Sequence, residues 1–259
     1  MQDLRVTLVQ SMLHWEDAEA NCAMFSEKLA PLQGVTDLII LPEMFSAGFS
    51  MRSHDLSETM DGATIAWMRG QAKRCNAAIY GSVIIEDNGE RYNRGLFVHP
   101  DGSIDHYDKR HLFRMADEQN YFTAGNERVV VAWKNWRILL QVCYDLRFPV
   151  FSRNRGDVDA MLYVANWPEV RRYPWSQLLI ARAIENQAYV VGLNRVGMDG
   201  KGHHYSGDSI VIDPRGAQIG GVAPSEEGIA TVLLDHTALQ DFRDKFPAGQ
   251  DSDVFRLEL

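Results

Sequence analysis

The sequence predicts a mixed α/β fold, equally described as α+β, in a single domain spanning residues 1–259. Short apolar or alternating segments typical of strands are separated by segments whose apolar residues recur at helical spacing. Several turn sequences also join neighbouring strands directly, and such hairpins do not occur in a purely parallel sheet. No Pro/Ser-rich linker and no change in composition marks a domain boundary, so we expect one domain with mixed sheets.

In the first half of the chain, residues 4–9 alternate as a half-buried strand does, and residues 37–41 form an apolar run typical of a buried strand. Between them, apolar residues recur three or four positions apart over 18–29, which predicts a helix that Pro31 and Gly34 end. The other elements expected here are a helix over 62–75 and strands over 77–85 and 92–98, with turns at 87–89 and 100–102.

The second half continues this alternation. A helix is predicted over 173–187, because Trp175, Leu179 and Ala183 fall on one face. The strands expected in this half cover 129–133, 137–142, 158–164, 189–194, 209–212 and 229–233, with a hairpin turn at 214–216. Helices and hairpins therefore alternate along the whole chain, which favours a mixed sheet.

Charge and composition exclude several classes of function. The 26 Lys and Arg residues against 35 Asp and Glu give a net charge of −9, which disfavours a general nucleic-acid or anionic-membrane surface. The longest apolar runs, such as 129–133, are far shorter than the ~18 residues that span a bilayer, and no targeting segment is evident. Three cysteines do not form a disulfide framework and suit a reducing compartment. We expect a cytoplasmic protein that binds neither nucleic acid nor membrane.

Cys143 directly follows the predicted strand 137–142. The end of a buried strand is where α/β folds present nucleophiles, and helical N–H groups close behind would favour a thiolate and later an oxyanion. The alternative interpretation is a buried cysteine that packs as a small apolar side chain, which is the commoner case. Cys22 and Cys75 lie within helical patterns, and we interpret both as bystanders.

Glu43 and Lys109 are two further candidates. Glu43 follows the apolar run 37–41 and one proline, so a desolvated carboxylate with raised proton affinity is expected there. The alternative is a glutamate in a surface loop. Lys109 follows a predicted hairpin, where a lysine is most often solvated. Each residue taken alone leaves both interpretations open.

Three short motifs occur in order along the chain: Leu41-Pro42-Glu43, residues 107–113 and residues 142–149. Taken together, they resemble the motifs of the nitrilase, or carbon–nitrogen hydrolase, superfamily. Any one short motif is weak, whereas this ordered set, with separations similar to the family's, covers nearly the whole chain. Residues 166–168 and 181–187 also resemble the stretches that follow the nucleophile in that family. Within it, residues 109–117, 163–167 and 245–247 are most similar to bacterial omega-amidases of the YafV type.

The resemblance implies a four-layer α-β-β-α sandwich of the nitrilase type with two mixed sheets, commonly assembled as a homodimer or a higher homo-oligomer. It also implies a Glu-Lys-Cys triad, which falls on Glu43, Lys109 and Cys143. The family's additional active-site glutamate matches Glu118, seven residues before Gly125. Two neighbouring acids, Asp117 and Glu127, remain alternatives for this last role.

These residue types fit the hydrolysis of an unactivated amide by water. Cys143 would attack the carbonyl carbon, and Lys109 and the Tyr144 backbone N–H would stabilise the oxyanion. The positive charge of Lys109 would also favour the thiolate. Glu43 would take the thiol proton, pass it to the leaving ammonia and then activate water, while Glu118 would orient Lys109 or the amide. This chemistry requires no metal and no cofactor.

The resemblance to omega-amidases implies terminal amides of short 2-oxo dicarboxylic acids as substrates, such as 2-oxoglutaramate and 2-oxosuccinamate. The far carboxylate of such a substrate calls for an arginine, and Arg171 and Arg172 are the nearest candidates; solvated loop arginines are the alternative. Phe49, Tyr144 and Trp167 are candidates for the walls of a small pocket, with plain core packing as the alternative. For Arg147 we expect an ion pair with Asp145.

Other functions remain open at this stage. A deaminated-glutathione amidase, a carbamoyl-amine hydrolase or a nitrilase would use the same triad. An acyl transferase would pass the acyl group to an amine, and a non-catalytic interaction module would have lost the Cys, Lys or Glu that this chain retains. The pairs His106/His111 and His203/His204 lack the compact spacing of zinc ligands, and we interpret them as surface or supporting residues.

Overall fold

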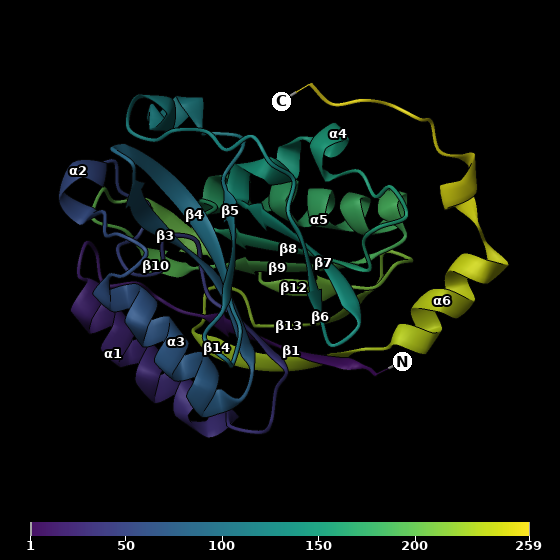
Figure 1. Cartoon of the computed structure of the whole chain (residues 1–259), viewed down its shortest axis with the longest axis horizontal. Coiled ribbons are helices and arrows are strands. Elements are labelled where there is room, and N and C mark those ends of the chain that lie inside the picture. The colour runs from purple at the N-terminus through teal and green to yellow at the C-terminus, as the bar shows by residue number, and fades with distance from the viewer. Residues whose placement is uncertain (1, 259) are drawn as a thin grey trace.

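The computed structural model describes residues 2–258, which form two six-stranded mixed sheets packed face to face (Figure 1). Helices α1 and α3 cover the outer face of one sheet, and helix α5 packs on the outer face of the other. The predicted four-layer α-β-β-α sandwich is therefore confirmed.

The first sheet has the strand order β14-β1-β2-β3-β4-β5. The central strands β1, β2 and β3 pair in parallel, whereas β14, β4 and β5 are added by antiparallel pairing. The strands are β1 (Leu4–Gln10), β2 (Leu38–Ile40), β3 (Ala78–Asp87), β4 (Glu90–Val98), β5 (Ile104–Asp108) and β14 (Gly228–Leu234).

The second sheet has the order β13-β12-β9-β8-β7-β6, with β7, β8 and β9 parallel and the outer strands antiparallel. Its strands are β6 (Val130–Trp133), β7 (Trp136–Val142), β8 (Ala160–Ala165), β9 (Tyr189–Asn194), β12 (Ile210–Ile212) and β13 (Gln218–Gly221). A separate hairpin is formed by β10 (Val196–Met198) and β11 (His204–Ser206).

The helices begin and end at residues suited to these positions. The Asp17 side chain caps α1 by accepting the backbone N–H of Ala20 at 2.9 Å, and Asn76 and Gln187 adopt left-handed conformations just after α3 and α5. The α-helices are α1 (Ala18–Leu29), α2 (Ser53–Leu56), α3 (Ala63–Cys75), α4 (Pro149–Ser152), α5 (Arg172–Asn186) and α6 (His236–Lys245). Short 3-10 helices cover Ala30–Leu32, Arg114–Ala116, Glu118–Asn120, Cys143–Arg147, Glu169–Arg171 and Ala248–Asp251.

Alternation along the strands divides the core into layers. In β2, Leu38 and Ile40 face the opposite sheet, whereas Ile39 packs with the α1/α3 layer. All three side chains are fully buried, so each contributes about 1.5–3 kcal/mol of burial free energy. This double-sided burial explains why residues 37–41 read as an uninterrupted apolar run.

The sequence did not reveal β5, the β10–β11 hairpin or helix α6. Strand β5 contains exposed Asp105 and His106, which hide the alternation expected of a strand, and β10 and β11 have only three residues each. Among residues 2–258, no helix is both long and apolar enough to cross a membrane.

Candidate active site

Four polar residues lie just after the ends of strands, at one end of the sandwich. Glu43 lies three residues beyond β2, Lys109 follows β5, Cys143 follows β7 and Asn166 follows β8. These strands come from both sheets, so the two sheets together deliver the four side chains to one place. The carboxyl ends of parallel strands are where open α/β sheets place ligand-binding residues.

Lys109 holds two glutamates in a buried cluster. Its Nζ donates to Glu43 Oε1 at 2.9 Å and to Glu118 Oε1 and Oε2 at 3.0 and 2.9 Å. All three side chains have 0% exposure. Glu118 Oε2 also accepts the Phe113 N–H at 2.6 Å. The structure therefore places Glu118 beside the lysine, whereas Asp117 lies at the wall of the adjacent cavity.

The charges in this cluster do not balance, because two carboxylates face one ammonium group. Burial alone would lower the pKa of Lys109, but the negative charges of Glu118 and Glu43 outweigh it and raise that pKa well above its usual value. Burial raises the pKa of the Glu118 carboxyl, a shift that Lys109 opposes and Glu43 increases. The lysine is thus firmly protonated, and two carboxyl groups share its positive charge.

Lys109 favours the Cys143 thiolate, as predicted, but larger effects outweigh it. Burial, together with the negative charge of Glu43, raises the pKa of the Cys143 thiol well above its usual value, and the opposing effect of Lys109 is smaller. Burial is the largest of these causes. In the free protein Cys143 is therefore a protonated thiol, and a base has to take its proton before the sulfur can attack.

Cys143 occupies an unusual backbone conformation. Its φ of 46° lies in the left-handed region, and the 3-10 helix Cys143–Arg147 begins at this residue. Asp145, fully buried, accepts the Val142 N–H at 2.9 Å and the Tyr107 hydroxyl at 2.8 Å, while its other oxygen accepts the His111 N–H at 3.0 Å. A carboxylate with several donors thus fixes the tight turn that exposes the sulfur.

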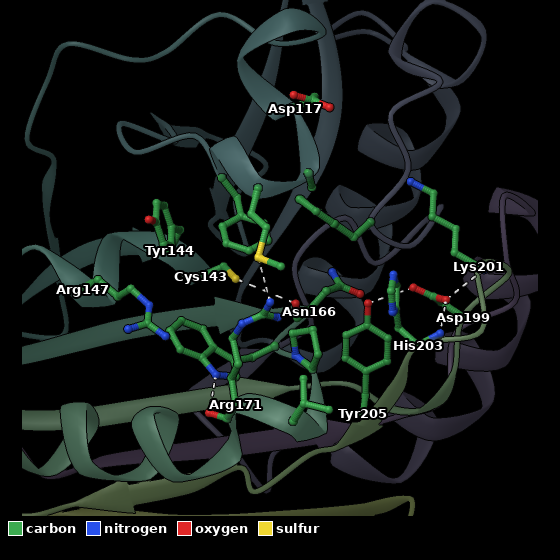
Figure 2. A pocket seen from close by; sticks show the side chains of 17 residues that line it. Asp117, Cys143, Tyr144, Arg147, Asn166, Arg171, Asp199, Lys201, His203 and Tyr205 are labelled. Atoms are coloured by element: carbon green, nitrogen blue, oxygen red, sulfur yellow. Dashed lines mark hydrogen bonds between the residues drawn. The ribbon is translucent and has the colours of Figure 1, made fainter.

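A cavity of about 350 Å³ opens above Cys143 (Figure 2). The Cys143 sulfur lies 3.9 Å from the backbone oxygen of Asn166. Arg147 and Arg171 lie on one side of these residues, and a second group lies on the other side, contributed by the β10–β11 hairpin. That second group consists of Asp199, Lys201, His203 and Tyr205.

Three of the four predicted substrate-binding residues line this cavity. They are Phe49, Trp167 and Arg171, and Tyr144 lines it as well. The Phe49 ring also lies 5.2 Å from the Lys109 Nζ, which links the cavity wall to the buried cluster. Arg172 does not contribute to the lining, because its guanidinium pairs with Asp208 at 2.6 Å. The structure therefore leaves Arg171 as the candidate of the pair.

The expected ion pair between Arg147 and Asp145 is not formed. The Asp145 oxygens are taken by Tyr107, His111 and the Val142 N–H, so they do not bind Arg147. The Arg147 guanidinium instead stacks over the Trp167 ring at 5.0 Å and lines the cavity.

The chain matches the sequence model of the carbon-nitrogen hydrolases over residues 5–244. It belongs to the carbon-nitrogen hydrolase family. The omega-amidase YafV of Escherichia coli K12 is 51% identical over 257 residues, covering 99% of this chain and 100% of that protein. The 2-oxoglutaramate amidase of Bacillus subtilis is 33% identical, covering 83% and 84% of the two chains.

Among solved structures of this family, one from Xanthomonas campestris matches with a TM-score of 0.98 and 48% identity, covering all of both chains. It is a CN-hydrolase superfamily protein with an arsenic adduct in its active site. As a carbon-nitrogen hydrolase, this chain acts on linear amides as an amidohydrolase.

Sequence reasoning missed several residues around this carbon-nitrogen hydrolase site. Asn166 binds Glu43 through its backbone N–H, 2.8 Å from Oε2, and through its side-chain amide, 2.6 Å from the Glu43 backbone oxygen. Asn93 also binds Glu43. The cavity residues of the β10–β11 hairpin were missed as well, and His203 was interpreted as a surface residue. Asn93 lies within β4. The pattern of residues there predicted a strand, but nothing in it indicated that the Asn93 side chain binds Glu43.

The described residues, 2–258, hold no group of three or more His, Cys, Asp or Glu side chains arranged to bind a metal ion. The polar groups gathered at the site are Cys143, the buried Glu43–Lys109–Glu118 cluster and the backbone groups around them.

Proposed function

We propose that this protein is an omega-amidase that hydrolyses the terminal amide of small 2-oxo dicarboxylic acid monoamides, such as 2-oxoglutaramate and 2-oxosuccinamate, to the acid and ammonia. The observation that carries the proposal is Cys143 at the floor of a cavity, next to a buried glutamate–lysine cluster. Relatives named omega-amidase and 2-oxoglutaramate amidase support the substrate class.

In the first half-reaction, the Cys143 sulfur forms a bond to the amide carbon while its proton passes to Glu43. Lys109 and the Tyr144 N–H donate to the oxygen of the tetrahedral intermediate. The raised pKa of the Cys143 thiol supports a transfer coupled to attack, because a free thiolate would be scarce at neutral pH. Glu43 then gives the proton to the amide nitrogen, the C–N bond breaks, and ammonia leaves a thioester.

In the second half-reaction, Glu43 takes a proton from water as the water oxygen attacks the thioester carbon. Collapse of the intermediate breaks the C–S bond, returns the proton to sulfur and releases the carboxylic acid. Glu118 stays bound to Lys109 throughout and holds the ammonium group in place. One carboxylate thus serves as base, acid and base again, with no further reactant than water.

Arg171 is the proposed partner of the far carboxylate. It lines the cavity, and its guanidinium lies over the Phe113 ring at 5.5 Å and 2.9 Å from the Met115 sulfur. Neither contact neutralises its charge, so it stays available to pair with an anionic ligand. Phe49 and Trp167 would enclose the short carbon chain between this arginine and Cys143.

The direct test is ammonia release from 2-oxoglutaramate, 2-oxosuccinamate, glutamine, N-carbamoyl amines and simple nitriles. We expect the 2-oxo monoamides to have the highest kcat/KM. Cys143→Ala and Glu43→Gln should lose activity by at least about 10³-fold with unchanged circular dichroism. A preference for carbamoyl amines or nitriles would refute the substrate assignment. Full activity of Cys143→Ala would refute the mechanism and leave a non-catalytic module as the alternative.

We further propose that the chain acts in the cytoplasm as a homodimer or a higher homo-oligomer, as the family resemblance implies. All three cysteines are free thiols, which supports a reducing compartment. Light scattering coupled to size-exclusion chromatography measures the oligomeric state. A mass of one chain, 29.4 kDa, at micromolar concentration would refute the dimer.

A further inference from the structure

Asn93 connects the two glutamates of the buried cluster. It lies on β4, is fully buried, and donates through Nδ2 to Glu43 Oε1 at 2.8 Å and to Glu118 Oε1 at 3.2 Å. Its backbone oxygen accepts the Lys109 N–H at 3.0 Å. A single residue therefore contacts all three charged members of the cluster.

The orientation of the Asn93 amide follows from its neighbours. Both partners of Nδ2 are carboxylate oxygens, so the amide has to present its NH₂ group to them. Its Oδ1 consequently lies buried without a hydrogen-bond partner among the described residues. Leaving a buried carbonyl unpaired is unfavourable, which indicates that the two N–H bonds to the glutamates determine the arrangement.

These two bonds act on a cluster that is short of positive charge. Lys109 is the one cation bound to both glutamates in the described structure, and both carboxylates share its Nζ. Each N–H that points at a carboxylate stabilises its ionised form. On Glu43, three donors converge, from Asn93, Lys109 and the Asn166 N–H, and together they fix the orientation of the carboxyl group.

We propose that Asn93 is a positioning residue for the amidase reaction, which holds Glu43 in place as the base by bridging it to Glu118. Asn93 does not line the cavity above Cys143, so it acts through Glu43 and not on the substrate. The inference rests on the proposed function for its catalytic consequence, but the arrangement of the hydrogen bonds stands independently of the substrate.

The test compares Asn93→Ala and Asn93→Asp with the unmodified protein over pH 5–9. An N–H bond to a carboxylate favours its ionised form, so loss of this bond should move the acid limb of kcat/KM to higher pH by about one unit in Asn93→Ala. Asn93→Asp has nearly the same shape but places a third carboxylate in the cluster. It should therefore be the more impaired variant, with a larger shift.

A role in packing alone makes the opposite prediction, because the isosteric Asn93→Asp would then be milder than Asn93→Ala. Asn186→Ala is the matched control: Asn186 is also a buried amide, bound to the Arg182 backbone oxygen at 2.9 Å, and lies on α5 outside the cavity. It should lower stability without moving the acid limb. An unchanged acid limb in folded Asn93→Ala, or an Asn93→Asp variant resembling the unmodified protein, would overturn the proposal.

A second measurement tests the role of Asn93 independently of the proposed substrate. The rate of Cys143 alkylation by iodoacetamide, followed by mass spectrometry of its peptide, depends on Glu43 as a base and requires no amide substrate. If the unmodified protein hydrolyses none of the amides, the proposed function fails, but the alkylation profile still tests Asn93. We expect the acid limb of the alkylation rate to move to higher pH in both variants, and further in Asn93→Asp than in Asn93→Ala. An acid limb that does not move would refute the role of Asn93.

Discussion

Lys109→Met removes the one ammonium group that compensates two buried carboxylates. The substitution keeps a long, flexible side chain and deletes three hydrogen bonds of 2.9–3.0 Å to Glu43 and Glu118. Breaking a buried ion pair by removing one partner costs about 3–5 kcal/mol, because the remaining charge stays desolvated. For a domain of this size that corresponds to a fall in Tm of about 10 °C.

The pH dependence of the variant provides the sharper measurement. Without the lysine, the two glutamates repel each other, so the folded state favours a protonated carboxyl more than the unfolded state does. The unfolded state then binds fewer protons, and stability falls as the pH rises above the ordinary carboxyl range. Urea unfolding followed by tryptophan fluorescence should therefore show a much smaller loss at pH 5 than at pH 8.

Two further variants make this reasoning refutable. Lys109→Met combined with Glu118→Gln leaves a single buried carboxylate and should recover part of the lost stability at pH 8. Lys201→Met, at the exposed edge of the cavity, should change stability by less than about 0.5 kcal/mol. A Lys109→Met variant as stable as the unmodified protein at pH 8, or equally destabilised at both pH values, would show that the cluster is not governed by its charge imbalance.

Three other predictions concern single carboxylates and the thiol. Burial alone would raise the pKa of Asp37, but bonds from Arg5 and Lys134 lower it to about 2, so Asp37→Asn should cost about 1–2 kcal/mol in urea unfolding at pH 7 and nothing near pH 2. Because the pKa of Cys143 is raised, the unmodified protein should lose thermal stability above about pH 8.5, and Cys143→Ala should lose less. Asp145→Asn exchanges one acceptor oxygen for a donor in a fully satisfied buried site, and should lower both stability, by about 2 kcal/mol, and kcat.

Local patterns predict the strands that precede Glu43 and Cys143, but not β5, which precedes Lys109. The run 37–41 before Glu43 and the strand before Cys143 are apolar because both faces of these strands are buried, and that signal is contained in neighbouring residues. The four-layer architecture came from the resemblance of the motifs, since periodicity alone indicates only a mixed α/β fold. Helix α6 was not predicted, because only His236 and Leu239 are buried along its length and they leave no repeated apolar pattern in the sequence.

The electrostatics of the site could not be predicted from the sequence. That Lys109 is fully buried between two glutamates depends on segments 43, 109 and 118 meeting in space, and a lysine after a hairpin is ordinarily solvated. The raised pKa of the Cys143 thiol follows from its burial and from the negative charge of Glu43, which only the fold brings together. In the same way, Arg171 and Arg172 are adjacent in sequence, and only the fold shows that Asp208 binds the second one.

The left-handed backbone conformation of Cys143, the proposed nucleophile, lowers the stability of the folded chain. A side chain there costs on the order of 1 kcal/mol that a glycine would not, so selection for stability alone would favour replacing the reactive residue. Directed evolution for heat resistance without an activity screen would therefore tend to erase the sulfur, and any consensus design on this scaffold has to hold position 143 constant.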